Sequence, residues 1–345
     1  MEDTVKLLEQ KQKQLQQLLP LPKEQEKSLE DWLRVELTYS SNAIEGNTLT
    51  RIETAEVIEK GVSATISGKS LKEQLEAINH AKAVDFIKTL AKGHRGHQFI
   101  SEQNIVTIHK IILTGIQDED AGVYRKTDVY LKGRDLELPS PPRVLYLMQD
   151  FLGWLSYQPT KHPILVAAQA HFKFVSIHPF ADGNGRTGRL LMNLILLLNG
   201  YPMTIIRKED REEYLNVLYA GQKNGTMEPY YRFIENAVGR SLDVYLNAAK
   251  GKPIFAVIHP ESRNEKKLLR VGELAKQSGV SEHTIRYWTE EELLTVKETT
   301  AGGYKLYAPI MIEVITEIQR LKKELRLTLS EIKERLQKSG TNLPA

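Results

Sequence analysis

The run from His178 to Arg189, HPFADGNGRTGR, is the feature that most constrains how this chain can fold, because it has the composition of a loop entering a buried helix. Its glycines permit a sharp turn, and the residues that follow, Leu190 to Leu198, are mostly apolar. A helix start presents free N–H groups and the positive end of the helix dipole, so it binds phosphate readily. We therefore expect a phosphate-handling site that contains its own base, although each residue taken singly is more often structural.

The complete run resembles the signature of the Fic family, His-x-Phe-x-Asp/Glu-Gly-Asn-Gly-Arg-x-x-Arg, and this chain meets every specified position. The resemblance extends from about Leu33 to about Asn247 and implies a mainly α, Fic-type helical bundle with a small β-hairpin flap. Fic enzymes typically transfer AMP from ATP to a hydroxyl group on a protein. The resemblance implies that His178 is the base that takes the proton from that hydroxyl. It also implies that Asp182 holds Mg²⁺ against the phosphates.

The resemblance assigns nucleotide binding to five further residues of the run. Gly183, Asn184 and Gly185 match the turn over the phosphates, and Arg186 and Arg189 match the arginines that hold the β and γ phosphates. Position 185 also discriminates within the family, because the Doc-type kinases, which bind ATP reversed, carry lysine there. Glycine at this position favours transfer of a nucleotide over phosphorylation.

An upstream stretch, residues 41–46 (SNAIEG), resembles the inhibitory motif of Fic proteins, Ser/Thr-x-x-x-Glu-Gly/Asn. Residues 31–44 can form a helix in which Ser41 and Glu45 share a face, and Gly46 is a helix stop. By resemblance, Glu45 pairs with Arg189 and occupies the position that the γ phosphate needs. The alternative for a glutamate near a helix end is an ordinary solvated side chain.

Residues 122–126 and 128–133 predict a β-hairpin with a turn near Lys132-Gly133. The family places a flap here, which pairs with the backbone of the target segment. The expected target contacts are Val129, Tyr130 and Leu131. The alternative is an ordinary surface hairpin.

Tyr214, Leu218 and Gln222 recur at helical spacing and match the region that lines the adenine pocket in the family. A stripe at this spacing is more often part of the core, so both interpretations stay open.

Helical periodicity dominates the first 250 residues and predicts helices over residues 5–19, 28–44, 50–60, 71–92, 101–113, 144–156, 163–174 and 186–199. We expect an N-terminal helical region at residues 1–115 that carries the inhibitory helix, a catalytic core at 116–250, a linker at 251–266 and a second domain at 267–345. Cysteine is absent, which excludes a thiolate metal site or nucleophile. No signal peptide or membrane-spanning run is recognisable, so the expected location is the cytoplasm.

The C-terminal segment has the pattern of a winged helix-turn-helix. Residues 271–278 predict a short helix, Gly279-Val280 a turn, and Ser281 the cap of a second helix that extends through Trp288. A wing-like hairpin at 301–307 and helices at 310–325 and 330–337 follow. The segment resembles the DNA-binding domain of the MerR family, with duplex DNA as the implied partner. The expected DNA contacts are His283, Thr284, Arg286, Tyr287 and Lys305.

Three alternatives remain open on sequence alone. Residues 267–345 carry 13 Lys and Arg against 11 Asp and Glu, a weak positive balance that leaves a protein-contact module possible. The same catalytic site can serve removal of AMP from a modified protein, with Glu45 positioning water. The third alternative is a DNA-bound regulator whose core only senses nucleotide. The presence of His178 and Asp182 argues against it, because a pure sensor needs no catalytic base. The protein itself is a candidate target, and a homodimer is a candidate assembly.

Overall fold

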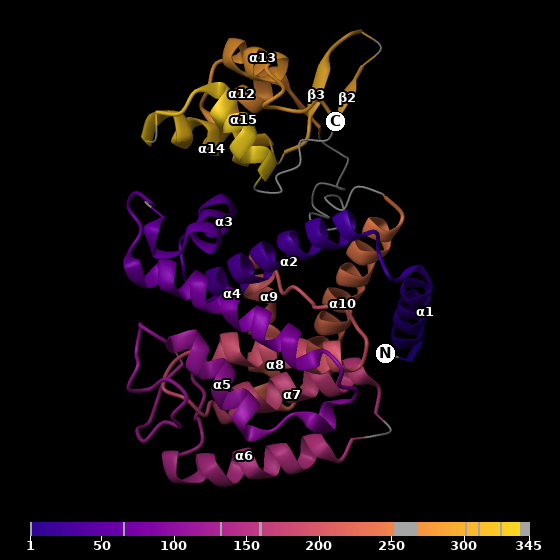
Figure 1. Ribbon diagram of the computed structural model, residues 1–345, viewed down its shortest axis with the longest axis vertical. Coiled ribbons are helices and arrows are strands. Elements are labelled where there is room, and N and C mark those ends of the chain that lie inside the picture. Colours follow the sequence, from indigo (N-terminus) through magenta and orange to yellow (C-terminus); the bar gives the residue numbers. More distant parts are fainter. Residues whose placement is uncertain are drawn as a thin grey trace. The chain divides into compact units, whose positions relative to one another are not determined.

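The computed structural model describes residues 2–64, 66–131, 133–158, 161–251, 268–300, 302–309, 311–324 and 326–338 (Figure 1). The chain divides into two compact units, residues 1–250 and residues 251–345. The predicted linker lies outside the described residues apart from Gly251. In the described part of the chain, no helix is both long enough and apolar enough to cross a membrane.

The first unit is built from helices, so the expectation of a mainly α fold is confirmed. They are α1 (Glu2–Leu18), α2 (Lys23–Ile44), α3 (Arg51–Lys60), α4 (Leu71–Ala91), α5 (Glu102–Leu113), α6 (Pro141–Ser156), α7 (Pro163–Ile177), α8 (Asn184–Leu198), α9 (Arg211–Asn224) and α10 (Glu228–Ala249). Every helix predicted from periodicity is present with ends shifted by a few residues, whereas α10 was not predicted. Capping boxes at Thr50, Ser70 and Ser101 explain where α3, α4 and α5 begin.

Helix α8 forms the centre of this unit. Apart from Gly185 and Leu197, all of its residues are buried, as expected of a helix that is apolar on every side beyond its first turns. It packs against α7, α4 and α5, and α7 packs in turn against α6 (Figure 1). The signature loop that precedes α8 is therefore fixed between elements that come from distant parts of the chain.

The predicted flap hairpin is wrong for the described residues. Tyr124 forms an isolated antiparallel bridge with Phe180 of the signature loop, and residues 125–131 after it form no strand. A turn is present at the predicted place, because the N–H of Arg134 donates to the carbonyl of Leu131 at 3.1 Å, although Lys132 itself lies outside the described part of the chain. The physical reason is competition for the backbone of residues 124–125. The signature loop pairs with these residues, so the described residues of 128–133 do not.

The second unit has the predicted helix-turn-helix and wing. Its elements are β1 (Leu269–Arg270), α12 (Val271–Ser278), α13 (Glu282–Glu290), β2 (Glu298–Thr299), β3 (Lys305–Tyr307), α14 (Met311–Glu324) and α15 (Leu329–Lys338). The strands form an antiparallel sheet in the order β1-β3-β2. Gly279 turns the chain between α12 and α13 with φ +71°, and the Ser281 side chain accepts a hydrogen bond from the N–H of Thr284, as predicted for the cap.

Three histidines of the first unit, His80, His109 and His171, are at most 1% exposed and neutral. Burial lowers the pKa of His80 to about 3, of His109 to about 4 and of His171 to about 3. The nearby guanidinium groups act in the same direction. Each residue therefore binds its proton more weakly in the folded chain than in the unfolded chain.

We expect the free energy of unfolding to fall as the pH is lowered from about 6.5 toward 4. In that window the unfolded chain takes up protons that the folded chain does not, and each such histidine contributes up to about 1.4 kcal/mol per pH unit. Urea unfolding curves at pH 7.0, 6.0 and 5.0 measure this. A free energy of unfolding that stays constant over this range would contradict the assignment of three neutral buried histidines.

Candidate active site

His178 ends helix α7, and its backbone lies in the left-handed region with φ +52°. That conformation is uncommon for a residue with a side chain and is concentrated at functional sites. Its Nδ1 atom lies 3.2 Å from the carbonyl oxygen of Val175. Because a carbonyl can only accept, Nδ1 carries the proton, and Nε2 keeps a lone pair with which it can act as a base.

Burial lowers the pKa of His178 below the ordinary histidine range, and the guanidinium of Arg125 acts in the same direction. The hydrogen bond to Val175 and the carboxylates of Glu45 and Asp182 oppose this shift. A lowered pKa keeps the imidazole neutral at neutral pH, which a proton acceptor requires.

Arg125, which no sequence motif marks, holds the backbone around His178. Its Nε donates to the carbonyl oxygen of His178 at 2.8 Å, and its terminal nitrogens donate to the carbonyls of Thr127 and Pro139. Its own N–H donates to the carbonyl of Pro179 at 2.9 Å. Arg125 is buried, so these bonds fix the segment around residues 124–127 against the signature loop.

Asn184 closes the signature loop on itself. Its Oδ1 accepts from the N–H of Phe180 at 2.9 Å, and its Nδ2 donates to the carbonyl of the same residue at 2.8 Å. Gly183 has φ +74°, and a side chain there would come within 3.2 Å of His109. The side chain of Asn184 thus shapes the turn, while binding of phosphate by the turn stays a prediction.

His109 supports this loop from α5, another contact that sequence reasoning missed. Its ring stacks on that of Phe180, with centroids 3.6 Å apart. Its Nδ1 accepts from the N–H of Gly122, so its Nε2–H donates to the carbonyl of Asp182 at 2.9 Å. His109 therefore holds the signature loop by stacking on Phe180 and by a hydrogen bond to Asp182, and Gly122 fixes the His109 ring in turn.

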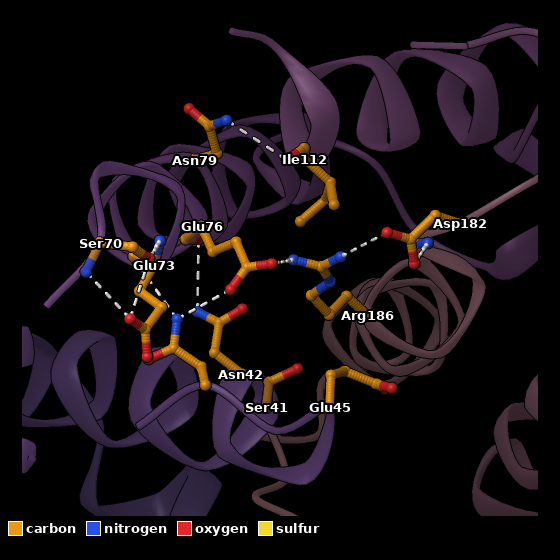
Figure 2. A network of polar contacts seen from close by, with 12 residues as sticks. Ser41, Asn42, Glu45, Ser70, Glu73, Glu76, Asn79, Ile112, Asp182 and Arg186 are labelled. Atoms are coloured by element: carbon orange, nitrogen blue, oxygen red, sulfur yellow. Dashed lines mark hydrogen bonds and ion pairs between the residues drawn. The ribbon is translucent and has the colours of Figure 1, made fainter. Parts of the chain in front are cut away.

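Figure 2 shows Arg186 between two carboxylates, Asp182 on its own loop and Glu76 on α4. The distances are 3.7 Å from NH2 to Asp182 Oδ2 and 3.3 Å from NH1 to Glu76 Oε1. The Arg186 side chain is 3% exposed, whereas that of Asp182 is 45% exposed. Asp182 also accepts from the N–H of Gly183 at 2.6 Å. Its carboxylate is therefore the half of the cluster that a ligand from solvent can reach.

No cluster of three or more His, Cys, Asp or Glu that could hold a metal ion unaided is found among the described residues. Mg²⁺ does not require one, since it commonly takes one or two carboxylates and completes its shell with phosphate oxygens and water. The exposed carboxylate of Asp182 at the start of α8 fits that donor set.

The predicted pairing of Glu45 with Arg189 is present in the structure. Arg189 NH2 lies 2.7 Å from Glu45 Oε1, and the two residues are 144 positions apart along the chain. Arg189 also donates to the Ser41 hydroxyl at 3.0 Å and to the Ser41 carbonyl at 2.8 Å. The motif at the end of α2 therefore occupies the buried guanidinium of the second signature arginine.

Two glycines beside this contact act in different ways, Gly185 by leaving room and Gly46 by its backbone conformation. A side-chain carbon at Gly185 would lie only 2.2 Å from Glu45 Oε1, so any larger residue there would displace the glutamate. Gly46 has φ +101° and ends α2 directly after Glu45. Arg211 Nε donates to the carbonyl of Ile44 at 2.7 Å, which holds the same helix end from α9.

The three residues predicted for the adenine pocket lie on α9 in different surroundings. Tyr214 is buried near the Arg189 guanidinium, and its hydroxyl lies 2.9 Å from His171 Nε2. Leu218 is buried, while Gln222 is partly exposed and donates to the Ser176 hydroxyl at 3.1 Å. The adenine assignment stays a prediction, and the observed hydrogen bond of Tyr214 is with His171.

The predicted target contacts lie on extended chain outside the core. Tyr130 is 88% exposed, and Val129 and Leu131 are partly buried. The segment beyond them is fastened to α9, because Arg134 donates to Asn216 at 2.8 Å. Strand pairing with a peptide needs backbone groups that can be reached from solvent, and the contact of this segment with a target stays a prediction.

In the second unit, α13 carries the predicted DNA residues on its solvent side. His283, Arg286 and Tyr287 are exposed, while Ile285 and Trp288 on the opposite side are buried. Two further side chains complete the predicted set: Thr284, which is partly exposed and bonded to Ser281, and Lys305, which is exposed on β3. The helix therefore presents the expected side chains to solvent.

Residues 99–196 match the family model described as Fic/DOC family, and residues 269–339 match that of the MerR HTH family regulatory proteins. A protein adenylyltransferase Fic from Culex quinquefasciatus is 37% identical over 210 residues, which are 60% of this chain and 41% of that protein. The chain thus spans about two fifths of the length of such curated relatives.

Two solved structures share the fold. A Fic domain containing signalling protein from Bacteroides thetaiotaomicron is 31% identical with a TM-score of 0.63, and the match covers 72% of this chain and 99% of that one. Fic-1 from C. elegans is 32% identical with a TM-score of 0.63, covering 72% of this chain and 73% of the other.

Proposed function

This chain belongs to the Fic/DOC family, and from that premise we propose that it is a protein adenylyltransferase, which moves AMP from ATP to a Ser, Thr or Tyr hydroxyl of a target protein. The observation that carries the proposal is the set of side chains at the start of α8. A histidine whose Nε2 carries a lone pair, a carboxylate that is 45% exposed and two buried arginines converge there. Similar proteins with 35% to 37% identity are named protein adenylyltransferase Fic.

The proposed reaction follows from these positions. Nε2 of His178 takes the proton of the target hydroxyl, whose oxygen attacks the α phosphorus of ATP as the bond to the β-phosphate oxygen breaks. The products are the AMP ester of the target and pyrophosphate. Asp182 would hold Mg²⁺, which when bound neutralises phosphate charge. Arg186 and Arg189 would bind the phosphates that leave.

We further propose that Glu45 inhibits this reaction. Arg189 is buried and already paired with Glu45, so a γ phosphate that needs the same guanidinium must displace that carboxylate. A hydrogen bond to a charged group contributes about 1.5–3 kcal/mol. A partner that binds α2 can therefore supply enough free energy to separate Glu45 from Arg189. A second candidate activity is removal of AMP, because the Glu45 side chain is 40% exposed and able to position a water molecule.

The test of the activity is peptide mass spectrometry after the purified protein is incubated with ATP, Mg²⁺ and a cell lysate. Adenylyl groups on Ser, Thr or Tyr of this protein or of lysate proteins are expected, in greater amount with Glu45→Gly than with wild type. Incubating the modified proteins with wild type in the absence of ATP tests removal, which would release AMP.

For the second unit we propose binding to duplex DNA. Arg286→Ala is expected to weaken binding across all sequences, because a phosphate contact carries no sequence information, whereas His283→Ala should change the sequence preference. Binding should fall steeply as salt rises, because phosphate contacts release counterions. One module of this size should bind weakly, so tight binding would require a dimer on a two-fold site.

Fluorescence anisotropy of the full-length chain on the DNA upstream of its own gene, at low and moderate salt, measures these effects. Glu282→Gln is a matched control, because it removes the intrahelical partner of Arg286 without removing a cation. Absence of binding at low salt would contradict the proposal and favour a protein-contact module.

A further inference from the structure

Arg186 is a buried cation that protein contacts leave incompletely satisfied. Its side chain is 3% exposed, and its Nε and NH1 atoms have no hydrogen-bond partner among the described residues. The two carboxylates beside it, Glu76 and Asp182, contact it at ion-pair distances of 3.3 and 3.7 Å. Buried donors without partners are costly, so a site with this arrangement is suited to an anionic ligand that completes the set.

The two carboxylates differ in how firmly they are held. The side chain of Asp182 is 45% exposed, so a cation from solvent can reach it and compete with Arg186 for its carboxylate. The side chain of Glu76 is 13% exposed and lies on α4 (Figure 2). Its second oxygen, Oε2, accepts from Asn47 Nδ2 at 2.9 Å, and Asn47 donates also to the carbonyl of Glu73 at 3.0 Å. Glu76 is thus fixed with one oxygen turned to Arg186.

This difference decides which carboxylate keeps Arg186 in place. A buried guanidinium is strongly destabilised when it has no anion beside it. When one of its two carboxylates is taken away, it therefore stays with the other. When Asp182 is engaged by Mg²⁺, Glu76 is the remaining anion in contact with Arg186 among the described residues. Without Glu76, Arg186 would hold Asp182 and compete with the metal.

We propose that Glu76 is a positioning residue that keeps Arg186 directed at the nucleotide phosphates and leaves Asp182 free for Mg²⁺. Asn47 lies two residues after Glu45, so the same contact ties Arg186 to the turn that follows the inhibitory helix. The inference rests on the proposed function, since it assumes that ATP binds at the start of α8.

The test is calorimetric titration of ATP into the Glu45→Gly, His178→Ala protein. The first substitution removes the inhibitory carboxylate, and the second blocks turnover. Glu76→Gln in this background is expected to weaken ATP binding about 10-fold to 100-fold with Mg²⁺, the worth of one hydrogen bond to a charged group. The loss should be several-fold smaller in EDTA, because Asp182 then stays with Arg186. Glu76→Asp keeps the charge and should restore part of the affinity.

Asp85→Asn is the matched control, because it removes a carboxylate of α4 that pairs with Arg34 on the surface. Its affinity for ATP should stay within about twofold of the parent, and thermal unfolding shows that each variant is folded. Unchanged affinity in a folded Glu76→Gln protein, or an equal loss with and without Mg²⁺, would overturn this inference alone. No ATP binding by the parent protein would overturn the proposed function together with it.

Discussion

Replacing His178 with alanine is expected to lower the rate of AMP transfer by about 10²–10⁴ and to leave ATP affinity within a few fold, because a positioned base contributes about that much to the rate. Nε2 of His178 has no hydrogen-bond partner among the described residues, and the hydrogen bonds of the His178 ring and carbonyl are with Val175 and Arg125 rather than with the signature arginines. The lowered pKa of His178 predicts that the rate of the active protein stays constant down to a pH below about 6.5 before it falls.

Quantified protein labelling from ATP labelled at the α phosphate, together with calorimetric ATP binding, measures both parts of this prediction. The Glu45→Gly protein is the background, so that the rate is high enough to follow. His94→Ala, which removes an exposed histidine outside the signature, is the control. Labelling by His178→Ala at the rate of the control would remove His178 from the role of base.

Replacing Glu45 with glycine is expected to raise self-labelling about 10-fold to 100-fold, because it frees the Arg189 guanidinium that the carboxylate now occupies at 2.7 Å. Glu45→Gln keeps the size of the side chain and loses its charge, so an intermediate rate is expected. Arg189→Ala in the Glu45→Gly protein should abolish the gain, because it removes the group that both the carboxylate and the γ phosphate use.

The measurement is an initial rate of self-labelling at saturating ATP and Mg²⁺. The control is Glu9→Gly, which removes a partly exposed glutamate of α1 that contacts His162. Equal rates for wild type and Glu45→Gly would show that the observed ion pair does not limit the reaction. A gain that survives Arg189→Ala would show that Glu45 acts through another group.

Local chemistry made the helices predictable. Ser70 and Ser101 each begin a helix with a partner three residues later, and the apolar run after Arg189 could only be buried. The Glu45 to Arg189 contact joins distant segments, and periodicity alone does not pair them. It was predicted because the two motifs carry a resemblance to one family.

The supporting contacts of the site were not predictable in the same way. The residues concerned are Arg125, His109 and Glu76, which are single residues of common types without a motif around them. Each contacts a signature residue that lies at least 53 positions later in the sequence. The prediction of the flap hairpin was wrong for a related reason. A local pattern predicted that residues 122–133 pair with one another, but the signature loop competes for the same backbone.

The most direct measurement compares two labels in the Glu45→Gly protein. It is incubated with Mg²⁺ and ATP labelled at either the α or the γ phosphate, and protein-bound label is counted. We expect label on protein from the α phosphate and none from the γ phosphate, with the α label absent when His178 is also replaced by alanine. Label from the γ phosphate would show phosphorylation, and label from neither would show that this site does not modify proteins. Either result would rule out AMP transfer by this site.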